Sequence, residues 1–151
     1  MNLNNFLKEG KIEKINVSIN DARNRLIKAI KNFNFAKKNF GEEDNDIIYS
    51  PIYDAIRIAC TSLLLLYGYR ARKGTDHHFI VINSAKDLLD GEMENEFNRI
   101  QKTRKKRNKL EYGDLDSISN SELKQVLADA EKLINKIDEL IKEKERKQAL
   151  V

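Results

Sequence analysis

The chain has 151 residues, of which 40% are hydrophobic and 34% charged, and its formal net charge is +4. This length suits one domain that buries a continuous core without disulfide or metal staples, so we expect a single domain over residues 1–151. Its apolar runs fall short of the roughly 18 residues that span a bilayer, and its N-terminus lacks a signal-peptide pattern, which argues against membrane and secreted classes.

The only cysteine, Cys60, has no second cysteine with which to form an intramolecular disulfide. Together with the missing signal pattern, this favours a reducing compartment and a cytoplasmic location. The apolar neighbours of Cys60 predict a small buried side chain.

Apolar residues recur at intervals of three and four. Residues that break helices are few, with one proline and six glycines in the chain. This spacing predicts an all-α protein. The first helix is expected from about Ser18 to Phe40, with Gly41 as its stop signal. Its apolar stripe consists of Ile19, Ala22, Leu26, Ile30, Phe33 and Phe40.

The second helix is expected over residues 50–67. Ser50 is its predicted N-cap, Pro51 takes the first helical position, and Gly68 ends it. Because this helix is apolar around most of its circumference, we expect it at the centre of the fold. A basic loop over residues 69–74 is expected to follow.

Two further helices are expected over residues 76–89 and 92–109, separated by an interruption at Asp90-Gly91. Thr75 is the predicted cap of the first, and Phe79, Ile82, Ala85 and Leu89 are its expected inward side chains. The β-branched run at 79–82 also fits a strand, but its length and the lack of a partner strand favour a helix.

The last helix is expected over residues 119–144. Ser119 and Glu122 form a predicted capping box, and Ile118 and Leu123 occupy the positions of a hydrophobic staple. The charged tail over residues 142–151 is expected to fray. The sequence therefore predicts an up-and-down bundle of about five helices, with its core over residues 18–144.

A basic segment precedes this last helix and carries seven cations in the eleven residues from Arg99 to Lys109. Such a field attracts phosphate chains without a sequence code. A solvated helix end is the alternative, because the helix dipole stabilises cations at a C-terminus. The candidate RNA contacts are Arg99, Lys102, Arg104, Lys105, Lys106 and Lys109.

The segment ends in Arg107-Asn108-Lys109-Leu110-Glu111-Tyr112. Upstream lie the helix YDAIRIACTSLLLLYGYR at 53–70 and a Gly-x-x-His-His segment at 74–78. In helix order and motif position, residues 20–141 resemble the HEPN family, in particular small prokaryotic members of toxin–antitoxin and defence type. The usual family signature is Arg, four to six residues, then His, and here Tyr112 stands at the His position.

The resemblance implies a metal-independent ribonuclease that needs no cofactor, in which the ribose 2′-hydroxyl attacks the adjacent phosphate. Arg107 matches the motif arginine, and a guanidinium suits stabilisation of the phosphoryl charge. Asn108 is expected to orient the phosphate or the ribose.

Tyr112 is where this chain departs from the family. With a pKa near 10, a phenol is a poor general base at neutral pH. Tyr112 could instead donate a proton, accept a nucleotidyl group as a tyrosine near the motif does in some toxin members, or pack as a structural ring. His77 and His78 are the only histidines, and His78 is the catalytic candidate if it lies near Arg107. Adjacent helical histidines point about 100° apart, so a shared metal site is not expected.

Three partners are expected: RNA, a second copy of the chain, and a separate nucleotidyltransferase that acts as antitoxin. The homodimer follows from the family and from apolar positions that a single bundle is not expected to bury completely, namely Leu65, Leu66 and Leu140. The alternative to a ribonuclease is a catalytically inactive HEPN binding module, or a scaffold for the nucleotidyltransferase.

Overall fold

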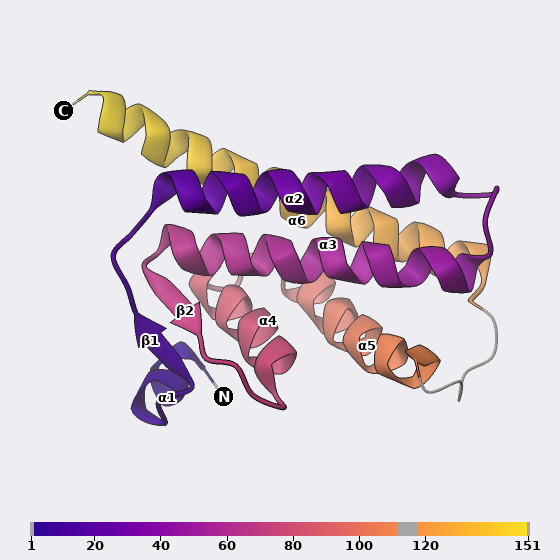
Figure 1. Cartoon of the computed structure of the whole chain (residues 1–151), viewed down its shortest axis with the longest axis horizontal. Coiled ribbons are helices and arrows are strands. Elements are labelled where there is room, and N and C mark those ends of the chain that lie inside the picture. The colour runs from indigo at the N-terminus through magenta and orange to yellow at the C-terminus, as the bar shows by residue number, and fades with distance from the viewer. Residues whose placement is uncertain (1, 112–117, 151) are drawn as a thin grey trace.

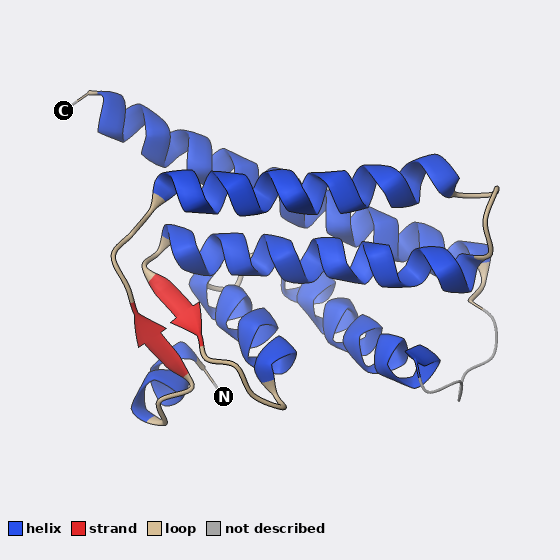
Figure 2. Cartoon of the chain, in the orientation of Figure 1, coloured by secondary structure: helices blue, strands red, loops and turns tan. Residues whose placement is uncertain are grey.

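The computed structural model describes residues 2–111 and 118–150. Within these residues the chain forms six helices and one small antiparallel sheet (Figures 1 and 2). In chain order the elements are α1 (Leu3–Lys8), β1 (Ile12–Lys14), α2 (Ile19–Asn39), α3 (Asn45–Leu66), β2 (Tyr69–Ala71), α4 (His77–Leu88), α5 (Glu94–Glu111) and α6 (Asn120–Ala149). The predicted all-α bundle is confirmed.

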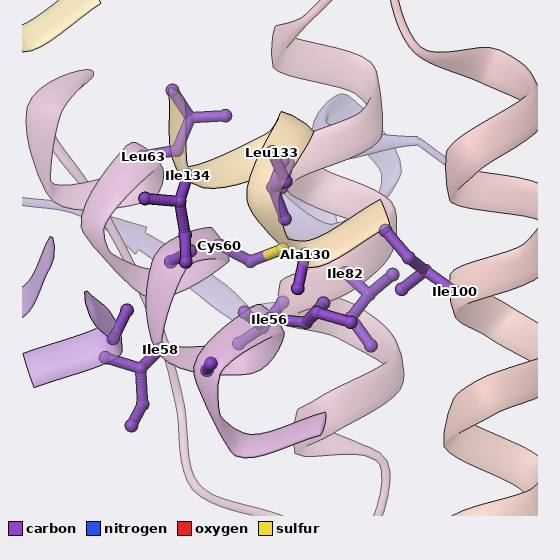
Figure 3. Close-up of a cluster of buried hydrophobic side chains, with 14 of the residues drawn as sticks. Ile56, Ile58, Cys60, Leu63, Ile82, Ile100, Ala130, Leu133 and Ile134 are labelled. Carbon is purple, nitrogen blue, oxygen red and sulfur yellow. The ribbon is translucent and has the colours of Figure 1, made fainter. Parts of the chain in front are cut away.

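Helix α3 lies at the centre of this bundle, as the sequence predicted. It contacts α2 and α6 on one side and α4 and α5 on the other (Figure 1). Figure 3 shows where the helices meet: Ile56, Cys60 and Leu63 of α3 pack among side chains of α4, α5 and α6. Cys60 is fully buried, and burial raises the pKa of its thiol to about 12. Its thiol therefore stays protonated inside the core.

Helices α2 and α6 begin where the sequence predicted. The Ser18 hydroxyl accepts a hydrogen bond from the Asp21 amide at 3.2 Å, and the Ser119 hydroxyl accepts one from the Glu122 amide at 3.1 Å. Helix α6 is longer than the expected 119–144, because it continues to Ala149. Ion pairs from Arg23 to Asp138 and Glu145 hold this last part of α6 against α2.

The predicted start of the central helix at Ser50-Pro51 is also wrong. Helix α3 begins at Asn45, after Asp44 as N-cap, and Pro51 lies inside it. Two long-range hydrogen bonds anchor the extra turn. The side-chain amide of Asn45 donates to the Ile118 carbonyl at 2.8 Å, and the backbone amide of Ile118 donates to the Asp46 carboxylate at 3.0 Å. Burial of Ile48 and Tyr49 adds to this tertiary stabilisation, which outweighs the cost of a proline inside the helix.

The expected basic loop over residues 69–74 contains the strand β2 instead. Residues 69–71 pair with β1 in an antiparallel register that places Ile12 opposite Ala71. Helix α4 follows with Asp76 as N-cap, so the predicted cap at Thr75 is wrong by one residue. The run at 79–82 is helical, as the sequence favoured.

Gly68 joins α3 to β2 in a left-handed conformation, with φ +81°. Its carbonyl accepts a hydrogen bond from the Ile15 amide at 2.9 Å. A Cβ at this position would lie 3.0 Å from the Ile15 carbonyl oxygen and 3.1 Å from a Val17 methyl group. Both the backbone angle and the close approach of the β1 segment therefore require glycine.

By length and composition alone, α3 is long and apolar enough to cross a membrane, although the sequence predicted no segment of this kind. However, 67% of its most apolar 18-residue window is buried inside the bundle. This burial is typical of the core helix of a globular protein.

The structure buries more of Leu65, Leu66 and Leu140 than the sequence led us to expect. Leu66 is fully buried, and Leu65 and Leu140 are partly buried against the core. The large apolar side chains that are exposed in the described residues are Val17, Ile27, Phe35, Ile47 and Leu150.

Candidate functional site

An open pocket of about 720 Å³ lies between the start of α4 and the C-terminal half of α5. The loop before α4 forms one wall, and α5 forms the other. Three of the four catalytic candidates from the sequence line this pocket, namely His78, Arg107 and Asn108. The full lining is Lys73, Gly74, Thr75, Asp76, His77, His78, Phe79, Arg104, Arg107 and Asn108.

Arg107 is held from α3 as well as from α5. Its guanidinium lies 3.8 Å from the Asp54 carboxylate and stacks over the Tyr53 ring, with 5.4 Å between the guanidinium carbon and the ring centroid. Its side chain is only 17% exposed. Asp54 also faces Arg57 at 3.7 Å, so one carboxylate is shared by two guanidinium groups. The group keeps a net positive charge, which suits a phosphate.

Tyr53 also contacts His78. The Tyr53 hydroxyl lies 3.2 Å from His78 Nδ1, and the two ring centroids are 5.8 Å apart. Tyr53 is fully buried and comes from α3, whereas His78 stands in the first turn of α4. One buried tyrosine therefore positions both the imidazole of His78 and the guanidinium of Arg107.

The electrostatic setting keeps the His78 imidazole neutral near pH 7. Partial burial, together with the positive charges of Arg57 and Arg107, lowers the pKa of His78 to about 4. Burial also raises the pKa of the Tyr53 phenol well above its usual value, so Tyr53 remains a neutral partner. A neutral imidazole has a free lone pair for a proton, but a pKa of about 4 makes it a weak base until a bound phosphate offsets the charges of the two arginines.

Arg104 is the other α5 cation that lines this pocket. Its Nε donates to the Gln101 side chain at 3.0 Å, and its guanidinium stacks over the Phe79 ring at 5.4 Å. One carboxylate, Asp76, also lines the pocket, and it is ion-paired with Lys11 at 3.0 Å. Lys11 lowers the pKa of Asp76, so this pair adds little net charge to the site.

Two of the predicted RNA contacts turn toward α6 and not toward this pocket. Arg99 forms a bidentate contact with the buried Asp129, with N–O distances of 2.9 and 3.0 Å. Lys106 is ion-paired with Glu122. Both cations thus join α5 to α6. An RNA phosphate would have to compete with Asp129 and Glu122 for these two side chains.

The other predicted contacts, Lys102, Lys105 and Lys109, are exposed on α5. Tyr112, the predicted catalytic or modified residue, lies outside the described residues. Within the described residues, no group of three or more His, Cys, Asp or Glu side chains is arranged to hold a metal ion.

Sequence reasoning missed Tyr53, Asp54 and Arg57, which α3 contributes to the site. A signal for two of them was present, because Asp54 and Arg57 are the only charged residues between Ile47 and Tyr69. Charged groups in the middle of a helix that is otherwise buried need partners, and such partners gather at functional sites.

The chain matches the family model described as HEPN domain over residues 22–141. This match covers α2 to most of α6 and includes the whole pocket lining, while α1 and β1 precede it. No curated protein and no solved structure matches the chain.

Proposed function

The chain belongs to the HEPN family, and from that premise we propose that it binds RNA at the Arg107 pocket and cleaves it without a metal ion. The single observation that carries this proposal is that Arg107, Asn108 and a neutral His78 line the same open pocket. These groups supply a phosphate ligand and a proton acceptor, which is the minimum that transfer of a phosphoryl group to a ribose hydroxyl needs.

In the proposed reaction the 2′-oxygen of a ribose bonds to the adjacent phosphorus, and the bond from phosphorus to the 5′-oxygen breaks. His78 Nε2 takes the proton of the 2′-hydroxyl, and water protonates the leaving 5′-oxygen. Arg107 stabilises the charge that develops on the phosphoryl oxygens, and Asn108 orients the phosphate. The products are a 2′,3′-cyclic phosphate and a 5′-hydroxyl.

This assignment gives His78 the proton transfer that the family signature would give to position 112. It requires the tautomer in which His78 Nδ1 carries the hydrogen and donates a hydrogen bond to the Tyr53 oxygen. Nε2 is then unprotonated and free to act as the base. Tyr53 then acts as a positioning residue. Tyr112 remains a candidate for proton donation or nucleotidylation by a partner enzyme.

The test is incubation of the purified chain with labelled RNA in EDTA. We expect cleavage by the wild type and a loss of about 10²–10³-fold in Arg107→Lys, which keeps the charge but loses the guanidinium fork. Lys105→Ala removes an exposed cation two residues away and is the matched control, with cleavage close to wild type. Equal rates for the two variants would contradict the assignment of the motif.

The second candidate is an inactive module that binds RNA or a nucleotidyltransferase. The observation that favours it is the limited exposure of Arg107 and its contacts with Tyr53 and Asp54, which a purely structural arginine would also make. Absence of cleavage in EDTA, combined with RNA binding that depends on Arg107, would support this candidate over the ribonuclease.

In either case we propose that the chain acts as one domain in the cytoplasm. We further propose that a separate nucleotidyltransferase is its antitoxin, with Tyr112 as the acceptor. These statements depend on the family premise, and a search for a nucleotidylated peptide containing Tyr112 by mass spectrometry after co-expression would test the last of them.

A further inference from the structure

A second cavity, of about 250 Å³, lies where α2, α3, β2 and α4 meet, at the end of the bundle that carries the small sheet (Figure 1). Lys73 and His77 line both this cavity and the Arg107 pocket. The two spaces are therefore neighbours, and a chain that occupies one can continue into the other. The residues that line the second cavity are Arg25, Arg57, Ile58, Thr61, Leu64, Leu65, Tyr69, Arg70, Ala71, Lys73, His77 and Val81.

This lining combines cations with an apolar and aromatic wall, and it includes no carboxylate. Arg70 is partly neutralised, because it is ion-paired with Glu13 at 2.5 Å. Arg25 and Lys73 are exposed and form no ion pair with any described residue. The cavity thus retains positive charge at its rim, while Tyr69 offers a half-buried ring and Leu65 a partly buried aliphatic side chain.

Arg57 links the two spaces from the side of α3. Its guanidinium lies 3.7 Å from Asp54, which is also the carboxylate partner of Arg107. Its Nε is buried and has no hydrogen-bond partner within the described part of the chain. The Arg57 side chain is 27% exposed, so a ligand oxygen can reach its exposed part but not the buried Nε.

Size and chemistry together identify the class of ligand. The cavity is smaller than the roughly 300–1,000 Å³ typical of sites for drug-sized molecules, so it suits one base and not a longer segment. Single-stranded nucleic acid is bound by aromatic rings that stack on bases and by cations that follow the backbone, which is the combination present here.

We propose that the second cavity binds the base of the nucleotide adjacent to the phosphate held at Arg107, with Tyr69 as the stacking platform. This inference rests on the proposed RNA-binding function. The ring centroid of His77 is 6.0 Å from that of His78. His77 and Lys73 both lie where the two spaces meet. The RNA backbone passes these two side chains, so the base site and the phosphate site act on consecutive nucleotides.

Two fluorescent probes that lack 2′-hydroxyls, and so cannot be cleaved, test the inference by anisotropy: a short 2′-deoxy oligouridylate, and a chain of abasic deoxyribose phosphates of the same length. The wild type should bind the oligouridylate about tenfold more tightly, the effect of one stacked base. Tyr69→Leu keeps the apolar bulk but loses the aromatic face, and it should remove this preference. Arg107→Lys should weaken both probes alike.

Arg25→Gln provides a variant without risk to the fold, because Arg25 is exposed on α2. It should weaken oligouridylate binding several-fold, whereas Lys28→Gln, an exposed cation one turn further along α2 and outside the cavity, should not. Equal affinity of the wild type for the two probes, or a preference that survives in Tyr69→Leu, would overturn the base site while Arg107-dependent binding upheld the proposed function. Failure of both probes to bind would overturn the proposed function as well.

Discussion

At the scale of single residues, the surroundings of His78 strongly change the pKa of its imidazole. An exposed imidazole titrates near pH 6.5, but at this position partial burial and the charges of two guanidinium groups oppose its protonation. The same arginines that suit a phosphate therefore help burial to keep the neighbouring base neutral. The charge of Arg107 would thus serve twice, once on the substrate and once on the proton acceptor.

This coupling makes the stability of the fold depend on pH. Because the pKa of His78 is about 4 in the folded chain and near 6.5 when unfolded, the unfolded state binds more protons between these two values. The contribution of His78 to the free energy of unfolding is complete above about pH 6.5, and it is lost as the pH falls toward 4. We expect the wild type to lose stability in this range more steeply than His78→Gln.

Urea unfolding of both proteins between about pH 4 and 7 measures this difference. Thr75→Ala, a variant of a pocket residue without a titratable side chain, is the control and should follow the wild type. If the wild type and His78→Gln gave parallel curves, the lowered pKa of His78 would be contradicted.

The candidate site could be predicted in part at this scale. Arg107, Asn108 and His78 follow from a short motif and from the rarity of histidine in the chain. Their partners Tyr53 and Asp54 could not be found in the same way, because each pairs with a residue 25 or more positions away. Local patterns do not encode such contacts, which depend on how α3, α4 and α5 pack.

At the scale of elements, the sequence predicts the boundaries that are set by interactions between residues close in the chain. It does not predict those set by contacts between distant residues. Helices α2 and α6 are capped by serines that bond within their own first turn, so the local sequence predicts where they start. Strands β1 and β2 have three residues each and are joined by pairing across 59 positions, from Ile12 to Ala71. Neither strand is long enough for its alternation to be recognised.

The capping of α6 gives a prediction at this scale. Ser119→Ala removes the hydroxyl that accepts from the Glu122 amide, and it should lower the free energy of unfolding by about 1 kcal/mol. Ser121→Ala is the matched control, because Ser121 is exposed in the same first turn. Its effect should be close to zero. Thermal or urea unfolding of the two variants measures the contrast, and equal losses would argue against the cap.

At the scale of the whole molecule, the distribution of charge matters more than the total of +4. Along α5, the cations that face α6 meet Asp129 and Glu122. Arg104 and Arg107 line the main pocket and stack on aromatic rings, and the one carboxylate that faces Arg107, Asp54, is shared with Arg57. The positive field of the basic segment is therefore directed toward the pocket side of the molecule, where a phosphate chain would approach.

Because the chain belongs to the HEPN family, we expect it to form a homodimer. One copy buries Leu66, so the reason for expecting a dimer now rests on other side chains: Ile27 and Phe35, two turns apart on α2, are 44% and 53% exposed. A two-fold pair that buries these side chains would remove apolar surface from water, and closed two-fold pairs are the commonest assembly. Sedimentation velocity at tens of micromolar should show twice the mass of one chain.

Phe35→Asp should shift this species to the mass of a single chain, because a dimer would have to bury an unpaired carboxylate at its contact. Leu150→Asp places the same charge on an exposed leucine at the end of α6 and is the control, which should leave the dimer intact. A wild type that sediments only as one chain would contradict the homodimer. A dimer that survives Phe35→Asp would show that the two copies meet through a different face, since α2 could then contribute little to the contact.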